Sequence, residues 1–128
     1  MADGTKKILI VEDEPSMLQV LSDALRAEKF DVVTASDGVE GLRQAETHHP
    51  DLILLDIVMP KMDGVSMMKK LRSENDWGKN VPIIILTNLS ADDEILKSVT
   101  VSEPAYYLIK TNWTITDVII KVKERLGM

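Results

Sequence analysis

The chain has 128 residues, of which 45% are hydrophobic and 28% charged, as is typical of one globular domain with a single core. It contains no cysteine, which excludes disulfides, thiolate metal sites and cysteine nucleophiles. The formal net charge of −6 disfavours direct binding to nucleic acid, and no apolar run approaches the roughly 20 residues of a membrane helix. Because the start MADGTKK also lacks the apolar core of a signal peptide, we expect one cytoplasmic domain spanning residues 1–128.

Five short apolar runs recur along the chain and are predicted to be strands. Most of them are continuously apolar rather than alternating, which is typical of strands that are covered on both faces of a sheet. The runs cover residues 7–11, 31–35, 52–55, 83–86 and 106–109.

Helical patterns lie between these runs. Pro15 suits a first helical position, and Ser36-Asp37, Ser90 and Thr114 stand where N-caps are expected. A shorter helix is expected between Gly64 and Ser73. Repeated alternation of strand and helix predicts right-handed crossovers and a parallel sheet with helices on both faces. We therefore predict a doubly wound, flavodoxin-like (βα)5 fold with strand order 2-1-3-4-5.

Polar side chains follow four of the five predicted strands. The first strand is followed by Glu12 and Asp13, the third by Asp56, the fourth by Thr87 and the fifth by Lys110. In an open parallel sheet, ligands bind outside the carboxyl ends of the strands, where the strand order reverses. The predicted order makes the third strand a neighbour of the first and fourth, so Asp56 should lie between the acidic pair and Thr87.

Three carboxylates in one pocket repel each other and favour a hard cation with oxygen ligands, for which Mg²⁺ is the natural choice. Asp56 could then attack a phosphoryl group and form an acyl phosphate. Mg²⁺ and Lys110 would offset charge on the transferred phosphoryl group, and the Thr87 hydroxyl would donate a hydrogen bond to it. A chain of this kind catalyses only its own phosphorylation and dephosphorylation, so we do not expect an enzyme with an external substrate.

At these residues the chain resembles the receiver domains of two-component response regulators, a family that includes single-domain chemotaxis and sporulation regulators. The resemblance rests on ILIVEDE, LILLDIVMPKMDG, IIILTN and the later lysine, and it covers essentially the whole chain. It implies that Asp56 is the phosphoacceptor and that Asp13 ligates Mg²⁺ directly. It further implies that Glu12 belongs to the metal site and that the main-chain carbonyl of Val58 is a metal ligand.

The resemblance also implies a switch and two kinds of partner. Thr87 would be the switch hydroxyl and Tyr107 the switch aromatic, acting on the face made by the family's fourth helix, fifth strand and fifth helix. A histidine kinase or a phosphotransfer protein would donate the phosphoryl group, and an output protein would bind that face. Neither nucleic acid nor a membrane is expected as a direct partner.

The chain departs from the family pattern close to the site. Thr111 follows Lys110, where the family usually has a proline joined through a cis peptide, and a non-proline cis bond costs about 2.5–4 kcal/mol. Asn88 follows Thr87, where the family usually has a small residue. These differences bear on the details of switching more than on phosphorylation.

Two alternatives compete with a phosphorylated receiver. A degenerate receiver would keep the fold as an interaction module that works without phosphorylation. A phosphatase of the haloacid-dehalogenase type would also use an aspartyl phosphate, but it needs D-x-D after the first strand, and VEDEP does not supply this. The second alternative is excluded.

The remaining conspicuous side chains are expected to be structural. His48 and His49 should lie exposed in a loop, and Trp77 should lie in the loop before the fourth strand. Met67 and Met68, like Met59 and Met62, are expected to pack in the interior.

Overall fold

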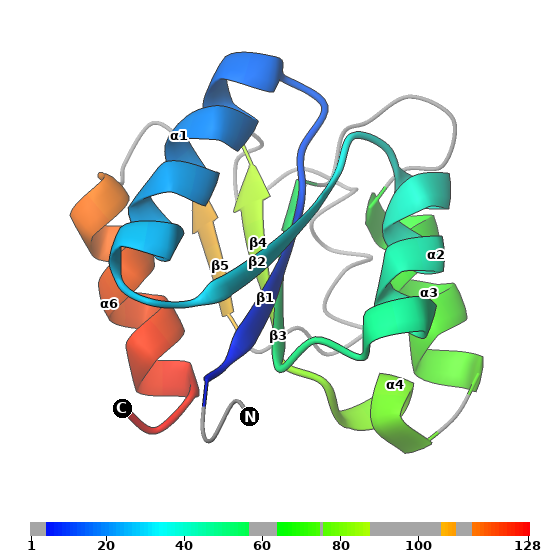
Figure 1. Cartoon of the computed structure of the whole chain (residues 1–128). Helices are drawn as coiled ribbons and strands as arrows, with labels where there is room; N and C mark the ends of the chain where they lie inside the picture. The colour runs from blue at the N-terminus through cyan, green and yellow to red at the C-terminus, as the bar shows by residue number, and fades with distance from the viewer. Residues whose placement is uncertain (1–4, 57–63, 75, 88–105, 110–113) are drawn as a thin grey trace.

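The computed structural model of the protein describes residues 5–56, 64–74, 76–87, 106–109 and 114–128. Within these residues, five parallel strands form one sheet in the order β2-β1-β3-β4-β5 (Figure 1). The strands are β1 (Lys7–Val11), β2 (Asp31–Ala35), β3 (Leu52–Asp56), β4 (Ile83–Thr87) and β5 (Tyr106–Ile109). The predicted fold class and strand order are therefore confirmed.

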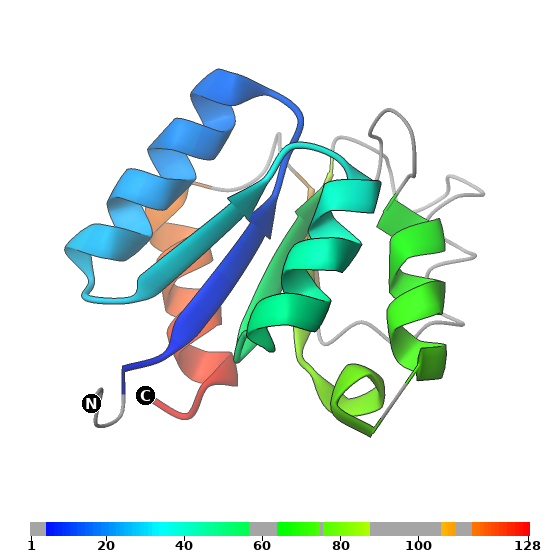
Figure 2. The ribbon, with the colours of Figure 1, turned by 45° about the vertical axis from the view of Figure 1, so that its right-hand side comes forward.

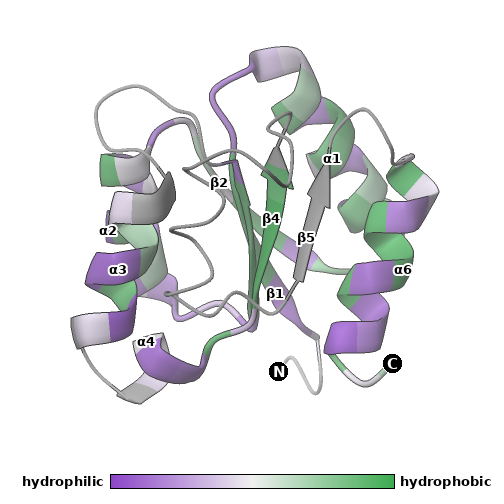
Figure 3. Ribbon diagram, turned by 180° about the vertical axis from the view of Figure 1, so that it is seen from behind, coloured by the Kyte–Doolittle hydropathy of each residue, from purple (hydrophilic) through white to green (hydrophobic). Residues whose placement is uncertain are grey.

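Helices cover both faces of the sheet. Helices α1 and α6 lie together on one face, and α2 and α3 lie on the opposite face (Figures 1 and 2). The helices are α1 (Pro15–Ala27), α2 (Gly38–His48), α3 (Gly64–Glu74), α4 (Asp76–Asn80) and α6 (Ile115–Arg125). Viewed from behind, hydrophobic colour runs along β4 between the two helix layers, while α3, α4 and α6 carry hydrophilic colour (Figure 3).

Successive strand residues point to opposite helix layers, which explains the continuously apolar runs. Ile8 and Ile10 of β1 belong to the core cluster that contains residues of α1 and α6. Leu9 and Val11 belong to the cluster that contains residues of α2 and α3. Both layers are stabilised by burial of apolar side chains, and the four apolar residues of β3, at positions 52–55, are fully buried.

The predicted helix starts agree with the structure wherever it describes them. Pro15 occupies the first turn of α1, and the Asp37 side chain caps α2 by accepting a hydrogen bond from the Glu40 amide at 2.8 Å. Thr114 and Asp117 form a reciprocal capping box at the start of α6. The helix predicted to open at Ser90 lies outside the described residues.

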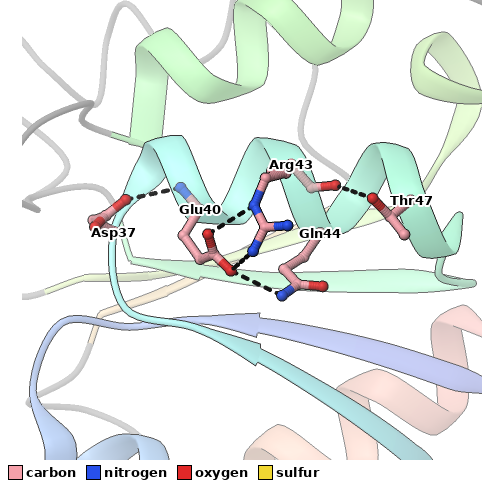
Figure 4. Close-up of polar contacts among 5 residues, drawn as sticks. All are labelled: Asp37, Glu40, Arg43, Gln44 and Thr47. Atoms are coloured by element: carbon pink, nitrogen blue, oxygen red, sulfur yellow. Dashed lines mark hydrogen bonds and ion pairs between the residues drawn. The ribbon is translucent and has the colours of Figure 1, made fainter.

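The outer face of α2 carries a chain of polar contacts (Figure 4). Arg43 donates two hydrogen bonds to the Glu40 carboxylate, and Gln44 donates a third at 2.8 Å. The hydrogen bonds from Arg43 and then Gln44 lower the pKa of the Glu40 carboxyl below its ordinary value. One turn later, the Thr47 hydroxyl donates to the Arg43 carbonyl at 2.8 Å.

The expectation that Trp77 lies in a loop is wrong, because residues 76–80 form the short helix α4. Five residues with a central glycine show no helical periodicity, and so short a helix is not stable from local propensity alone. Tertiary contacts hold it instead: one Arg72 nitrogen donates to the carbonyls of Gly78 at 2.9 Å and Val81 at 2.7 Å. Trp77 packs against the core cluster on this side of the sheet.

The two histidines are exposed, as predicted, but only His49 lies outside the helix. His48 is the last residue of α2, and His49 ends it with φ of 44°, a left-handed conformation. The His49 ring stacks on Trp77 with centroids 4.3 Å apart. Met67 and Met68 are fully buried, which confirms their packing role, whereas Met59 and Met62 lie outside the described residues.

None of the helices in the described ranges is both long and apolar enough to pass through a membrane.

Candidate functional site

The sheet register brings the acidic strand ends together. Val11 pairs with Leu55 across β1 and β3, so the residues that follow them, Glu12 and Asp56, lie side by side at the carboxyl ends of these strands. Asp56 in turn pairs with Leu86 on β4, which places Thr87 one step beyond it. These positions lie at the carboxyl ends of β1, β3 and β4, at the point where the chain order of the strands reverses.

Three carboxylates converge there. Glu12, Asp13 and Asp56 each offer an oxygen atom, and these atoms all lie within 4.8 Å of one another. Glu12 is 2% exposed and Asp56 is 6% exposed, whereas Asp13 is exposed to solvent. Burying carboxylates beside one another costs free energy unless a cation compensates their charge. The donor set consists of hard carboxylate oxygens, which fits Mg²⁺ and does not suit a soft metal.

Backbone contacts explain why Glu12 is buried rather than exposed. Its amide donates to the carbonyl of Ala35 at 3.0 Å, which continues the pairing of β1 with β2 by one residue. Its carboxylate accepts a hydrogen bond from the backbone N–H of Glu14 at 3.3 Å. Glu12 therefore extends the strand while its side chain turns into the acidic cluster.

Glu14 is a neighbour of the site that no sequence pattern indicates. Its backbone amide contacts the carboxylate of Glu12, and its own carboxylate accepts a hydrogen bond from the Ser16 hydroxyl at 3.0 Å. The only sequence signal was its position directly after the acidic pair. That position does not reveal which way an exposed side chain turns.

The other predicted site residues are described in part or not at all. Thr87 ends β4 and pairs with Ile109 of β5. Tyr107 of β5 pairs with Ile85 of β4. The structure describes the backbone of Thr87 and Tyr107 but not their side chains. Val58 and Lys110 lie outside the described residues, as do Asn88 and Thr111 at the positions that depart from the family pattern. Their predicted roles stay predictions.

Residues 8–121 match the response regulator receiver domain family. The chain belongs to this family. The resemblance inferred from the sequence is thereby confirmed, and the acidic cluster of this receiver domain lies where its strand order reverses.

Known relatives and solved structures agree with this assignment. The chain is 46% identical over 92 residues to the alkaline phosphatase synthesis transcriptional regulatory protein PhoP of Bacillus subtilis, covering 72% of this chain and 36% of PhoP. The first curated relatives are longer, and the chain spans about a third to a half of their length.

Two solved structures illustrate the likeness. Chemotaxis response regulator CheY4 of Vibrio cholerae is 27% identical with a TM-score of 0.85, covering 94% of this chain and 98% of that one. The receiver domain of the sensor histidine kinase PA1611 of Pseudomonas aeruginosa is 29% identical with a TM-score of 0.86, covering 98% and 100%. That structure holds a magnesium ion in its active-site cleft.

Proposed function

We propose that this receiver domain accepts a phosphoryl group on Asp56 from the phosphohistidine of a histidine kinase or phosphotransfer protein, with the help of Mg²⁺. The observation that carries the proposal is the burial of Asp56 among three clustered carboxylates at the carboxyl edge of the sheet. Such a cluster lowers stability in the absence of a cation, which favours a functional reason for it. The magnesium-containing receiver domain of PA1611 supports the choice of metal.

The proposed roles divide among five positions. Glu12, Asp13, Asp56 and the carbonyl of Val58 would hold Mg²⁺, which when bound would neutralise charge on the phosphoryl oxygens. A carboxylate oxygen of Asp56 forms a bond to phosphorus while the phosphorus–nitrogen bond of the donor breaks, and the electron pair returns to the imidazole. Lys110 would stabilise negative charge on the transferred group.

Phosphorylation is proposed to act through the neighbouring strands. Thr87 would donate a hydrogen bond to the phosphoryl group, and Tyr107 would move with it as the switch aromatic. Thr87 and Tyr107 lie on paired strands, with Thr87 opposite Ile109, which supports a short path between them. The output protein would bind the face made by the helix expected to open at Ser90 together with β5 and α6, which are the family's fourth helix, fifth strand and fifth helix. Such a domain catalyses only its own phosphorylation and dephosphorylation. Its switch would be an element with two states, and the phosphoryl group would favour one of them.

Direct binding of DNA is not proposed for these 128 residues. PhoP is named a transcriptional regulatory protein, but the chain matches only about a third of its length. The net charge of −6 favours a protein partner over phosphate-rich nucleic acid. We also propose that the receiver domain acts in the cytoplasm.

A degenerate receiver, which would signal without phosphorylation, is the second candidate. Retention of the acidic cluster argues against it, because an interaction module has no need of buried, mutually repelling carboxylates.

Mass spectrometry after incubation with Mg²⁺ and a small acyl phosphate tests the proposal. The wild type should gain one phosphoryl group, and both excess chelator and the Asp56→Asn substitution should abolish the gain. Asp23→Asn, an exposed control on α1, should leave it unchanged. Phosphate uptake by Asp56→Asn would exclude Asp56 as the sole acceptor, and no uptake by the wild type would favour the degenerate receiver.

A further inference from the structure

Glu14 follows Asp13 in the loop between β1 and α1 and does not belong to the acidic cluster. As the N-cap residue of α1 it makes no side-chain capping bond to the helix. Its carboxylate instead accepts a hydrogen bond from Ser16, while its backbone N–H donates to Glu12. The charge of Glu14 is therefore held on the first turn of α1, next to the loop that carries two of the three clustered carboxylates.

The side-chain contacts of Glu14 show whether its charge is compensated by a nearby cation. Among the residues that the structure describes, Glu14 forms no ion pair with a lysine or arginine; its side-chain partner is the neutral Ser16 hydroxyl. Ion pairs elsewhere, such as Arg43 with Glu40 and Lys123 with Glu28, show that other carboxylates of the chain do have such partners. A cation approaching the cluster would thus meet the Glu14 charge in addition to those of the ligands.

We propose that Glu14 is an outer carboxylate of the metal site, which raises the affinity for Mg²⁺ through its charge without ligating the ion. The inference rests on the proposed function, since it presupposes a metal held by Glu12, Asp13 and Asp56. Because Glu14 is exposed, its field acts through water, so its neutralisation should weaken Mg²⁺ binding about two- to fivefold at low salt. At about 1 M salt, where the screening length is only about 3 Å, the difference should disappear.

Calorimetric titration of Mg²⁺ into the full chain measures this effect without relying on phosphorylation. Glu14→Gln removes the charge and keeps an oxygen that can accept the Ser16 hydrogen bond. Glu46→Gln is the matched control, because it removes the same charge from an exposed position near the end of α2, at the opposite edge of the sheet. Ser16→Ala removes the anchor but keeps the charge, so its affinity should fall less than that of Glu14→Gln.

The outcomes separate the two levels of the proposal. Weaker binding by Glu14→Gln at low salt, lost at high salt and absent in Glu46→Gln, supports the inference. The inference is overturned if Glu14→Gln binds Mg²⁺ as tightly as the wild type or if Glu46→Gln loses as much affinity. It is also overturned if the loss of affinity in Glu14→Gln persists at high salt, because Glu14 would then be a ligand of the ion. If the wild type binds Mg²⁺ but Glu14→Gln behaves identically, only this inference fails; if the wild type binds no Mg²⁺, the proposed function fails with it.

Discussion

Gly41 on α2 lies so close to Val11 on β1 that a side chain at position 41 would require its neighbours to move. A β-carbon at position 41 would stand 3.0 Å from both γ-carbons of Val11 and 3.0 Å from the sulfur of Met67 on α3. The missing side chain lets α2 approach both the strand that leads into the acidic cluster and the neighbouring helix.

Gly41→Ala should therefore be destabilising despite the better helix propensity of alanine. The propensity gain of about 1 kcal/mol is opposed by overpacking of about 1–3 kcal/mol, so we expect a net loss of up to about 2 kcal/mol in the free energy of unfolding. Denaturant unfolding measures it. Met67→Ala opens space beside position 41, so Gly41→Ala should cost about 0.5–2 kcal/mol less in that background.

The control for this coupling is Leu25→Ala, which opens the core on the other face of the sheet. Gly41→Ala should there keep its full cost to within about 0.5 kcal/mol. Equal costs in the Met67→Ala and wild-type backgrounds would show that the Met67 contact does not limit the packing of α2.

Ser22→Ala should stabilise the domain. Ser22 is 3% exposed on α1, and within the described part of the chain its hydroxyl has no hydrogen-bond partner. Alanine removes this buried polar group and is the better helix former, so we expect a gain of about 0.5–1.5 kcal/mol in the free energy of unfolding. Ser73→Ala, at an exposed position on α3, should change stability by less than about 0.5 kcal/mol. A loss of stability in Ser22→Ala would indicate that the hydroxyl has a partner.

Glu40 makes stability depend on pH in a defined direction. Its hydrogen bonds from Arg43 and Gln44 lower the pKa of the folded carboxyl below its ordinary value. A lowered folded-state pKa stabilises the protein above the ordinary glutamate range, and this contribution is lost as the pH falls through the lowered value. Glu40→Gln should therefore slightly lower the melting temperature at pH 7, and the difference from wild type should shrink on acidification. A difference that stays constant with pH would contradict this.

Trp77 should not report on the metal site. Trp77 belongs to α4, which lies at the edge of the sheet opposite the acidic cluster (Figure 1), and its ring stacks on that of His49 at the end of α2. Trp113 follows the predicted phosphoryl-contacting lysine by three residues in the sequence. A fluorescence change on addition of Mg²⁺ should thus survive in Trp77→Phe and vanish in Trp113→Phe. The reverse pattern would show that the far edge of the sheet responds to the site.

Much of the fold could be predicted because it depends on local patterns. The continuous apolar run of β3 indicated burial on both faces, and both of its faces are covered. Asp37 and Thr114 could be recognised as caps because a cap contacts amides only a few residues away. The proximity of Glu12 and Asp56 could be predicted once the strand order was known, because neighbouring parallel strands have their carboxyl ends at the same edge of the sheet.

Only the tertiary structure decided the features that depend on residues distant in the chain or on side-chain direction. Helix α4 is held by hydrogen bonds from Arg72 and by packing of Trp77 against the core. Neither interaction can be predicted from a local sequence pattern. The burial of Ser22, and the turn of the Glu14 carboxylate toward Ser16, were equally invisible in the sequence. Sequence patterns record the average environment of a residue, apolar or polar, whereas individual contacts are set by how packed elements approach one another.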